Sequence, residues 1–300
     1  MTGPATASLT PATLRALARR HGVTPRKSLG QHFLIEPSLA SRIADLAGVG
    51  PGDRVLEIGA GLGSLTVALA ATGARVVAVE VDTKLLPALE EVVGGLENVQ
   101  VRCADALTAR WDDLLGTGDG AWVMAANLPY NVGARVVLRA LEEQPRIRRM
   151  LVMVQREVGD RLAAVPGDEQ FGAASLRVAY HATARVERRV PASVFWPAPG
   201  VESVLVRIDR RDEAPVDVDE AALFRVIREA FAQRRKTVRS GLVRLGMTRS
   251  EAAGALAASG IDEMARPEEL GLDEFGRLTA AVLARTPPGF PTPARPRSDP

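Results

Sequence analysis

The sequence predicts an α/β protein in which a Rossmann-like sheet is followed by a smaller, all-helical C-terminal domain. The first observation is an apolar stretch over 53–58 that runs into the glycine-rich turn Gly59-Ala60-Gly61-Leu62-Gly63 and then into a helical pattern over 64–71. A strand, a glycine-rich turn and a helix in this order form the first unit of a Rossmann-like sheet. The second observation is that only helical patterns follow the charged stretch at 210–219.

Length and composition indicate a globular protein of two domains, because the chain has 300 residues, of which 46% are apolar and 25% charged. No apolar run approaches the roughly 18 residues of a membrane span, and the first ten residues lack the apolar core of a signal peptide. The single cysteine, Cys103, is typical of a reducing cytoplasm, where we expect the protein to act as a monomer. One cysteine and three histidines give no cluster of metal ligands, so we expect no metal.

The other elements follow from caps and hydrophobic periodicity. Thr10 as N-cap and Pro11 at the first helical position predict a helix up to Arg20. Thr248 and Glu251 form a capping-box pattern at the start of a later helix. Further strands are expected at 75–79, 99–102, 121–126, 149–154, 185–190 and 204–208. Further helices are expected at 38–47, 133–141, 155–164, 171–180, 220–232, 236–245, 249–259 and 272–284.

Four predicted strands each end at a glycine or a polar residue: Gly59, Glu80, Asp105 and Asn127. The carboxyl edge of an open α/β sheet is where ligands bind. Glu80 lies 21 residues after Gly59, where an acid can hold both hydroxyls of a ribose. The glycines follow Gly-x-Gly-x-Gly rather than the Gly-x-Gly-x-x-Gly that NAD favours. We therefore expect S-adenosylmethionine (SAM), with its methionine portion on the glycine turn, its ribose on Glu80 and its adenine on Asp105.

The turn Asn127-Leu128-Pro129-Tyr130 follows a buried strand and is expected to face the same cleft. Asn127 offers an amide oxygen as acceptor, Pro129 holds the residue before it extended, and Tyr130 offers a ring on which a nucleobase can stack. The rigid segment that begins with Phe195 and contains Pro197 could hold the Phe195 ring across the cleft. The alternatives are an ordinary strand-to-helix turn and a core aromatic.

Basic residues are concentrated in two segments, although the net charge is only +2. Residues 1–35 carry five arginine or lysine residues and no acid, and residues 221–250 carry eight against Glu229 alone. Such patches suggest a polyanionic partner, whereas the alternative is a solvated helix face. The candidate RNA-binding residues are Arg234, Arg235, Lys236 and Arg239.

At this point the chain resembles the family of KsgA-type small-subunit ribosomal RNA adenine dimethyltransferases, over roughly residues 10–285. The resemblance rests on segments 27–34, 57–63, 127–130, 155–158 and 195–199. It implies SAM-dependent transfer of two methyl groups to N6 of each of two adjacent adenines near the 3′ end of 16S rRNA, in the small ribosomal subunit or its precursor. It further implies contacts with SAM from His32, Leu34, Gly59, Glu80, Asp105 and Asn127. His32 occupies a position where the family often has asparagine.

With the charged linker near 210–219 and the Pro-rich end, we expect a leader with a basic loop (1–30), a methyltransferase domain (31–210), a helical rRNA-binding domain (211–285) and a disordered tail (286–300). The expected chemistry is direct attack of adenine N6 on the SAM methyl group. The Asn127 side-chain oxygen and the Leu128 carbonyl would accept the N6 hydrogens. Two alternatives stay open: an adenine dimethyltransferase of 23S rRNA, as in antibiotic resistance, and a ribosome-assembly factor that acts mainly by binding.

Overall fold

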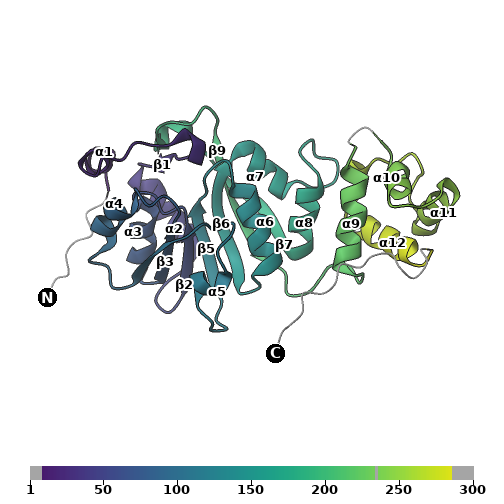
Figure 1. Cartoon of the computed structure of the whole chain (residues 1–300), viewed down its shortest axis with the longest axis horizontal. Helices are drawn as coiled ribbons and strands as arrows, with labels where there is room; N and C mark the ends of the chain where they lie inside the picture. Colours follow the sequence, from purple (N-terminus) through teal and green to yellow (C-terminus); the bar gives the residue numbers. More distant parts are fainter. Residues whose placement is uncertain (1–8, 234–235, 286–300) are drawn as a thin grey trace. The chain divides into compact units, whose positions relative to one another are not determined.

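The computed structural model describes residues 9–233 and 236–285, and the chain divides into two compact units (Figure 1). The first unit runs up to Ala163 and includes Ala182–Arg210, whereas the second comprises Ala164–His181 and the residues from Arg211 onward. The catalytic range predicted from the sequence, 31–210, therefore includes residues that pack with the second unit. Leu176 and Tyr180 are the reason, because both are buried in the helical core of that unit.

A mixed seven-stranded sheet forms the centre of the first unit, in the order β4-β3-β2-β5-β6-β9-β7. Its strands are β2 (Arg54–Ile58), β3 (Arg75–Glu80), β4 (Val99–Cys103), β5 (Trp122–Asn127), β6 (Ile147–Gln155), β7 (Ala182–Val190) and β9 (Ser203–Arg210). Strands β4, β3, β2, β5 and β6 are parallel, whereas β9 is antiparallel to both β6 and β7. The predicted Rossmann-like sheet is confirmed, with an antiparallel pair at one edge.

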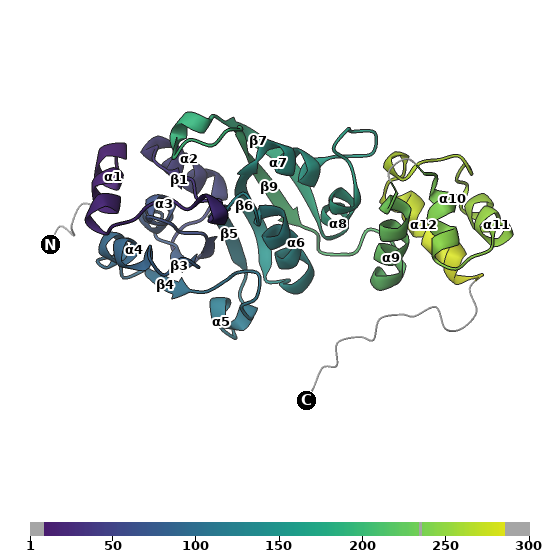
Figure 2. The same cartoon turned by 45° about the horizontal axis from the view of Figure 1, so that its top comes forward.

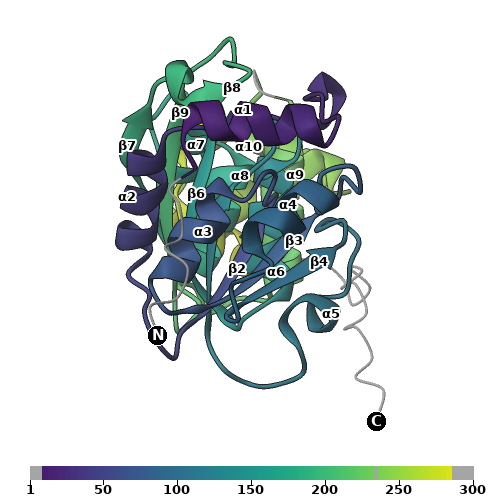
Figure 3. The ribbon, with the colours of Figure 1, turned by 90° about the vertical axis from the view of Figure 1, so that its left-hand side faces the viewer.

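Helices cover both faces of this sheet (Figure 3). They are α2 (Pro37–Ala47), α3 (Ser64–Ala71), α4 (Leu86–Val93), α5 (Trp111–Leu115), α6 (Gly133–Glu143) and α7 (Arg156–Ala163). Helix α1 (Pro11–Arg20) instead packs against Phe33 and Leu85, outside the faces of this sheet. On one face α2 and α3 bury Ile43 and Leu69 against the strands. On the other face α7 approaches so closely that a Cβ on Gly159 would lie 2.1 Å from Val204. Sequence patterns did not predict α4 and α5, which are short.

A second, two-stranded sheet joins distant parts of the first unit. Strand β1 (Phe33–Leu34) pairs antiparallel with β8 (Phe195–Trp196), so that Leu34 lies opposite Phe195. This sheet was not predicted either, because strands of two residues carry no periodicity. Short 3₁₀ turns flank the pair, η1 (Lys27–Leu29) before β1 and η2 (Ala192–Val194) before β8.

The second unit is all-helical in its described residues, as predicted (Figure 2). Its elements are α8 (Ala173–His181), α9 (Glu220–Phe231), α10 (Val238–Arg244), α11 (Arg249–Ser259), η3 (Pro267–Glu269) and α12 (Leu272–Leu283). The core includes Leu223, Leu256 and Phe275. The predicted capping box is present, since the Thr248 hydroxyl accepts from the Glu251 N–H while the Glu251 carboxylate accepts from the Thr248 N–H.

Across residues 9–233 and 236–285, no helix has the length and apolar character that spanning a membrane requires. The same residues contain no group of three or more His, Cys, Asp or Glu side chains arranged to hold a metal ion. The tail predicted over 286–300 lies outside the described residues.

Candidate active site

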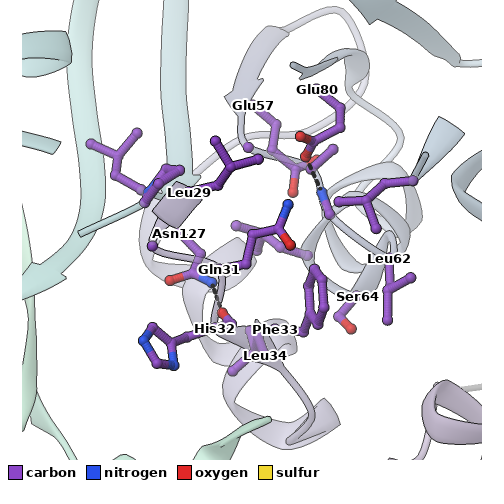
Figure 4. Close-up of a pocket in the computed structure, with 18 of the residues that line it drawn as sticks. Leu29, Gln31, His32, Phe33, Leu34, Glu57, Leu62, Ser64, Glu80 and Asn127 are labelled. Atoms are coloured by element: carbon purple, nitrogen blue, oxygen red, sulfur yellow. Dashed lines mark hydrogen bonds between the residues drawn. The ribbon is translucent and has the colours of Figure 1, made fainter. Parts of the chain in front are cut away.

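A pocket opens at the carboxyl ends of the adjacent strands β3, β2 and β5, the sheet edge at which ligands bind in this architecture (Figure 4). Its walls come from the glycine turn after β2, the end of β3, the turn after β5 and the segment 29–34. The structure brings these predicted site residues together in the lining: His32, Leu34, Gly59, Gly61, Glu80, Asn127, Leu128, Pro129 and Tyr130.

The glycine turn is held close to the opposite wall of the pocket. Gly59 and Gly61 have φ of +77° and +60°, a region that residues with a Cβ rarely adopt. A Cβ on Gly59 would lie 3.2 Å from Pro129 Cδ, and one on Gly61 would lie 3.1 Å from the Phe33 ring. Gly63 is close to a helix instead, because a Cβ added there would lie 3.0 Å from Val92 of α4. Among the described residues Gly63 is absent from the pocket lining, so its role is helix packing.

Glu80 ties the end of β3 to the glycine turn. Its side chain is 5% exposed, and its Oε2 accepts from the Gly61 N–H at 2.8 Å while its Oε1 accepts from the Asp82 N–H at 2.9 Å. Burial raises the pKa of Glu80, and these backbone donors oppose that rise. Each carboxylate oxygen retains acceptor capacity for a ligand hydroxyl.

Glu57, on β2, is a pocket residue that sequence patterns did not single out. It is 1% exposed, and burial raises its pKa to about 8, with the nearby Glu80 charge adding to the effect. Its Oε2 has no hydrogen-bond partner among the described residues. A buried carboxyl group with a free oxygen in a pocket is suited to a cationic or hydrogen-bond-donating ligand. The available signal was a charged residue inside the apolar run 55–58.

The Asn127 amide is oriented by the backbone that leads into β1. Its Nδ2 donates to the His32 carbonyl at 2.9 Å. Since a carbonyl can only accept, the amide nitrogen must occupy that position, and Oδ1 is left as the acceptor of this side chain. The backbone is also fixed, because the Leu128 N–H donates to the Met153 carbonyl of β6 at 3.0 Å.

The Tyr130 side chain has a partner at its hydroxyl and another beside its ring. Its hydroxyl lies 2.5 Å from the hydroxyl of Ser203, a fully buried residue of β9, and its ring centroid lies 4.9 Å from that of His32. Burial raises the pKa of Tyr130, so the hydroxyl stays protonated at neutral pH. The His32 ring is positioned in turn by its Nδ1, which donates to the Pro197 carbonyl at 2.7 Å.

Phe195 is not in the position that its sequence context predicted. The ring is 2% exposed and packs in the core with Leu34 and Ile43. Within the described part of the chain it does not contribute to the pocket lining. The reason is the β1–β8 pairing. It sets Phe195 opposite Leu34, and both side chains belong to the same buried core. The aromatic ring beside Tyr130 is that of His32.

Asp105, predicted to contact adenine, is exposed and organises its own turn. Its Oδ1 accepts from the Leu107 N–H at 2.8 Å. It is outside the lining of the pocket as formed by the described residues.

The basic segment before β1 covers part of the pocket. Gly30 has φ of +64°, and a Cβ there would lie 2.9 Å from the Tyr130 nitrogen. Gln31 donates to Asp82 at 2.8 Å, and the Arg26 guanidinium lies 3.0 Å from the same carboxylate. Asp82, which sequence patterns also did not single out, is 4% exposed. Residues 26–31 therefore contact the turn after β5 through Gly30 and the residues after β3 through Asp82.

The predicted RNA-binding residues are placed only in part. Arg234 and Arg235 lie outside the described residues. Lys236 is exposed. Arg239 forms an ion pair with Glu263 at 2.5 Å.

Comparison with known proteins agrees with this site. A sequence profile of the ribosomal RNA adenine dimethylase family matches residues 22–279. The protein called ribosomal RNA small subunit methyltransferase A in Moorella thermoacetica is 43% identical over 281 residues, which cover 91% of this chain and 98% of that protein. The protein of the same name in Nocardia farcinica is 45% identical over 282 residues, covering 91% and 95%.

Solved structures support the same fold. A dimethyladenosine transferase from Plasmodium falciparum superposes with a TM-score of 0.70 at 21% identity, covering 85% of this chain and 98% of that one. The 23S rRNA methyltransferase ErmE gives a TM-score of 0.65 at 24% identity, covering 83% and 99%. These two likenesses bear on the fold alone. The predicted enzyme class is confirmed by the profile and the relatives, and the chain belongs to the family of ribosomal RNA adenine dimethylases.

Proposed function

We propose that this enzyme uses SAM to place two methyl groups on N6 of each of two adjacent adenines near the 3′ end of 16S rRNA, in the small ribosomal subunit or its precursor. Relatives that are 43% and 45% identical carry the name of small-subunit methyltransferases, which favours this substrate over 23S rRNA. The pocket supplies the second support, because its polar groups suit both SAM and an adenine.

The acidic wall of the pocket fits SAM. Glu57 has a free buried oxygen that can accept a hydrogen bond from the ligand, and Glu80 can accept from ribose hydroxyls. Gly59 and Gly61 let the turn take positive φ and lie close to Pro129 and Phe33, which places the backbone of the turn in the pocket wall. When bound, SAM supplies a methyl group on a positively charged sulfonium, whose leaving group is a neutral thioether.

The orientation of the Asn127 amide is the observation that carries the proposal. Its Nδ2 is occupied by the His32 carbonyl, so Oδ1 accepts a hydrogen from adenine N6. With the Leu128 carbonyl accepting the other hydrogen, the nitrogen lone pair is withdrawn from the ring and directed towards the methyl donor. No general base is needed at this stage, since positioning is the main requirement. After the first methylation one N6 hydrogen remains, and one acceptor is enough to direct the second.

Tyr130 provides the stacking surface for an adenine turned out of its helix, at about 1–3 kcal/mol for base–aromatic stacking. The hydrogen bond to Ser203 fixes the plane of the ring before RNA arrives. A stacking role for Phe195 would require residues 195–199 to rearrange, because the ring is buried.

Lys236, with Arg234 and Arg235, would bind the rRNA backbone. Neutralising the three should weaken binding to small subunits and make it less dependent on salt. The slope of log affinity against log salt concentration should fall by about 0.7–0.9 for each phosphate that the variant no longer binds. An unchanged slope would favour the alternative that these charges are merely solvated.

The decisive experiment incubates the protein and SAM labelled in its methyl group with small subunits that lack the modification, followed by mass mapping of the rRNA. Dimethyl label on two adjacent adenines near the 3′ end of 16S rRNA is the expected result. Label confined to 23S rRNA, offered in parallel, would establish the antibiotic-resistance type instead. Full maturation of subunits by a catalytically inactive Asn127→Ala protein would favour an assembly factor that acts by binding.

A further inference from the structure

A cleft lined by three arginines lies at the β7 edge of the sheet, outside the pocket described above. We call it the arginine cleft. It is formed by Glu36, Ser38, Leu39, Arg42, Arg188, Arg189, Val190, Pro191 and Val194. Helix α2 supplies one side and the end of β7 supplies the other, and Figure 3 shows the two elements side by side.

Two consecutive arginines near the end of β7, Arg188 and Arg189, both line this cleft. They directly follow a bulge, because the register of β7 on β9 shifts between Val186 and Arg188 and leaves Glu187 as an extra residue. Such bulges are common at sheet edges and bend the strand that carries them. β7 is the last strand of the sheet, so its outer edge pairs with no other strand of that sheet.

The side chains of the three arginines of the cleft have no ion pair or hydrogen bond with any other described residue, and all three residues are exposed. This sets them apart from other arginines of the same sheet. Arg149 and Arg207 both pair with Asp209, at 3.0 Å and 2.7 Å. The guanidinium groups of the cleft are therefore left for a ligand.

The acids near the cleft are already engaged. Glu36 caps α2 by accepting from the Ser38 N–H and hydroxyl, and Glu187 pairs with Arg185 at 2.7 Å. Glu36 is the one carboxylate in the described lining. The cleft therefore holds three guanidinium groups against a single carboxylate, which favours an anionic ligand.

The arginine cleft is connected to the catalytic pocket by backbone. Two segments, 32–36 and 194–197, run antiparallel between them, paired at β1–β8 and by the Ile35 N–H, which donates to the Val194 carbonyl at 2.9 Å. One end of this ribbon reaches the pocket at His32, and the other reaches the cleft at Glu36. Four residues of extended chain span at most about 14 Å, so one RNA strand can reach both sites.

We propose that the arginine cleft binds phosphate groups of the RNA strand that carries the target adenine, and so sets how that strand runs into the pocket. This inference rests on the proposed function for the identity of the RNA. Guanidinium groups match phosphate oxygens with paired donors, and phosphate contacts fix register without reading sequence. Leu39, Val190 and Val194 form the apolar part of the lining, and the three arginines beside them are exposed to an approaching strand.

The test compares the full-length protein with a triple variant, Arg42→Gln, Arg188→Gln and Arg189→Gln. The matched control changes three exposed arginines near the opposite, β4 edge of the sheet: Arg75→Gln, Arg102→Gln and Arg110→Gln. Affinity for unmodified small subunits is measured from 50 to 300 mM salt, together with SAM affinity and the kcat and KM of methylation. A parallel titration replaces the subunits with inorganic phosphate.

We expect the cleft variant to bind subunits roughly 10- to 100-fold more weakly and its log–log salt slope to fall by about 2. Its KM for subunits should rise with little change in kcat, and its SAM affinity should equal that of the wild type. An equal loss of subunit affinity in the control variant would show that only the net charge of the protein matters, and it would overturn the proposal. Unchanged subunit affinity in the cleft variant would overturn it as well. Loss of phosphate binding alone, with subunit binding intact, would likewise overturn it.

The outcomes remain separable from the proposed function. If wild type binds subunits but leaves both adenines unmethylated, the proposed reaction fails, while the salt slope still decides whether the cleft binds RNA phosphates.

Discussion

Strands β2 and β3 contribute two buried carboxyl groups to the pocket, Glu57 and Glu80, whereas the end of β5 and the turn after it contribute the neutral amide of Asn127 and the hydroxyl of Tyr130. Glu57 is left with a free oxygen. On the other wall the Asn127 amide nitrogen and the Tyr130 hydroxyl are each held by a partner. The acidic wall thus lacks a hydrogen-bond donor at Glu57, whereas the neutral wall is already oriented.

This difference indicates a division of labour. Buried acidic groups without partners are unfavourable in the free protein and gain when a ligand brings charge or hydroxyl donors. Neutral groups that are already oriented add little to ligand affinity. They lower the activation free energy instead, because the reacting atoms are held in the required geometry. Substitutions on the acidic wall should therefore change stability and SAM affinity, and those on the neutral wall should change turnover or the use of RNA.

The largest effect is expected at Glu57, in protein stability. Its pKa is about 8 in the folded protein against 4.5 unfolded, so unfolding releases a proton between these values and stability falls as pH rises. In wild type this contribution is about 1.4 kcal/mol per pH unit in that window. Glu57→Gln should remove this pH dependence. The free energy of unfolding of the variant, measured in urea, should therefore rise relative to that of wild type from pH 5 to pH 8. Parallel curves would mean that Glu57 titrates normally.

Asn127→Ala should lower kcat by about 100- to 1000-fold, the scale found for removing one preorganised hydrogen-bonding group at a reacting centre. SAM affinity, measured by calorimetry, should stay within a few-fold. Asn131→Ala is the matched control, because it removes an exposed amide from the same turn. A turnover within a few-fold of wild type in Asn127→Ala would contradict the assignment of the neutral wall.

Glu80→Gln should weaken SAM binding by roughly 10- to 100-fold, since hydrogen bonds to a charged group contribute about 1.5–3 kcal/mol. Asp105→Asn serves as the comparison and should change SAM affinity less than twofold, because Asp105 is exposed and outside the described lining. Equal losses in the two variants would show that the turn after β4 closes over the bound cofactor.

The smallest effect is expected from the hydroxyl of Tyr130. Tyr130→Phe and Ser203→Ala remove the same hydrogen bond, at about 0.5–1.5 kcal/mol, so each should raise the KM for subunits by a similar factor of about 2 to 10. The double variant should be no worse than either, because the two residues share one interaction. Tyr130→Ala should cost more than Tyr130→Phe, because it also removes the stacking surface. Equal costs would assign the role to the hydroxyl alone.

Local signals were enough for most of the fold. The helix over 64–71 was predicted at the residues where α3 occurs, because the glycine turn fixes its start and the turn before Arg75 its end. The capping box at Thr248 likewise locates α11. Short elements escaped, among them α5 with five residues and the β1–β8 pair. Hydrophobic periodicity needs several repeats to be visible, and pairing between residues 33 and 196 leaves no local trace.

The same distinction holds within the site. Gly59, Glu80 and Asn127 were predictable because each ends a strand of one parallel sheet, which brings strand ends to a common edge. Phe195 and Asp105 lie outside the described lining. A strand end or a rigid loop gives a location along the chain but not the direction of a side chain. Glu57 was visible in the sequence, but its raised pKa is a property of burial that no local pattern carries.

The amino-acid order alone was sufficient to specify the α/β core, the helical C-terminal region, the family and most of the pocket lining, because these depend on periodicity, caps and residue types near one another in the chain. Three features required the folded chain: the burial of Phe195, the orientation of Asn127 by the His32 carbonyl, and the meeting of Arg42 with Arg188 and Arg189 in one cleft. Each of them depends on interactions between residues about 95 or more positions apart, and such interactions are fixed by packing and register.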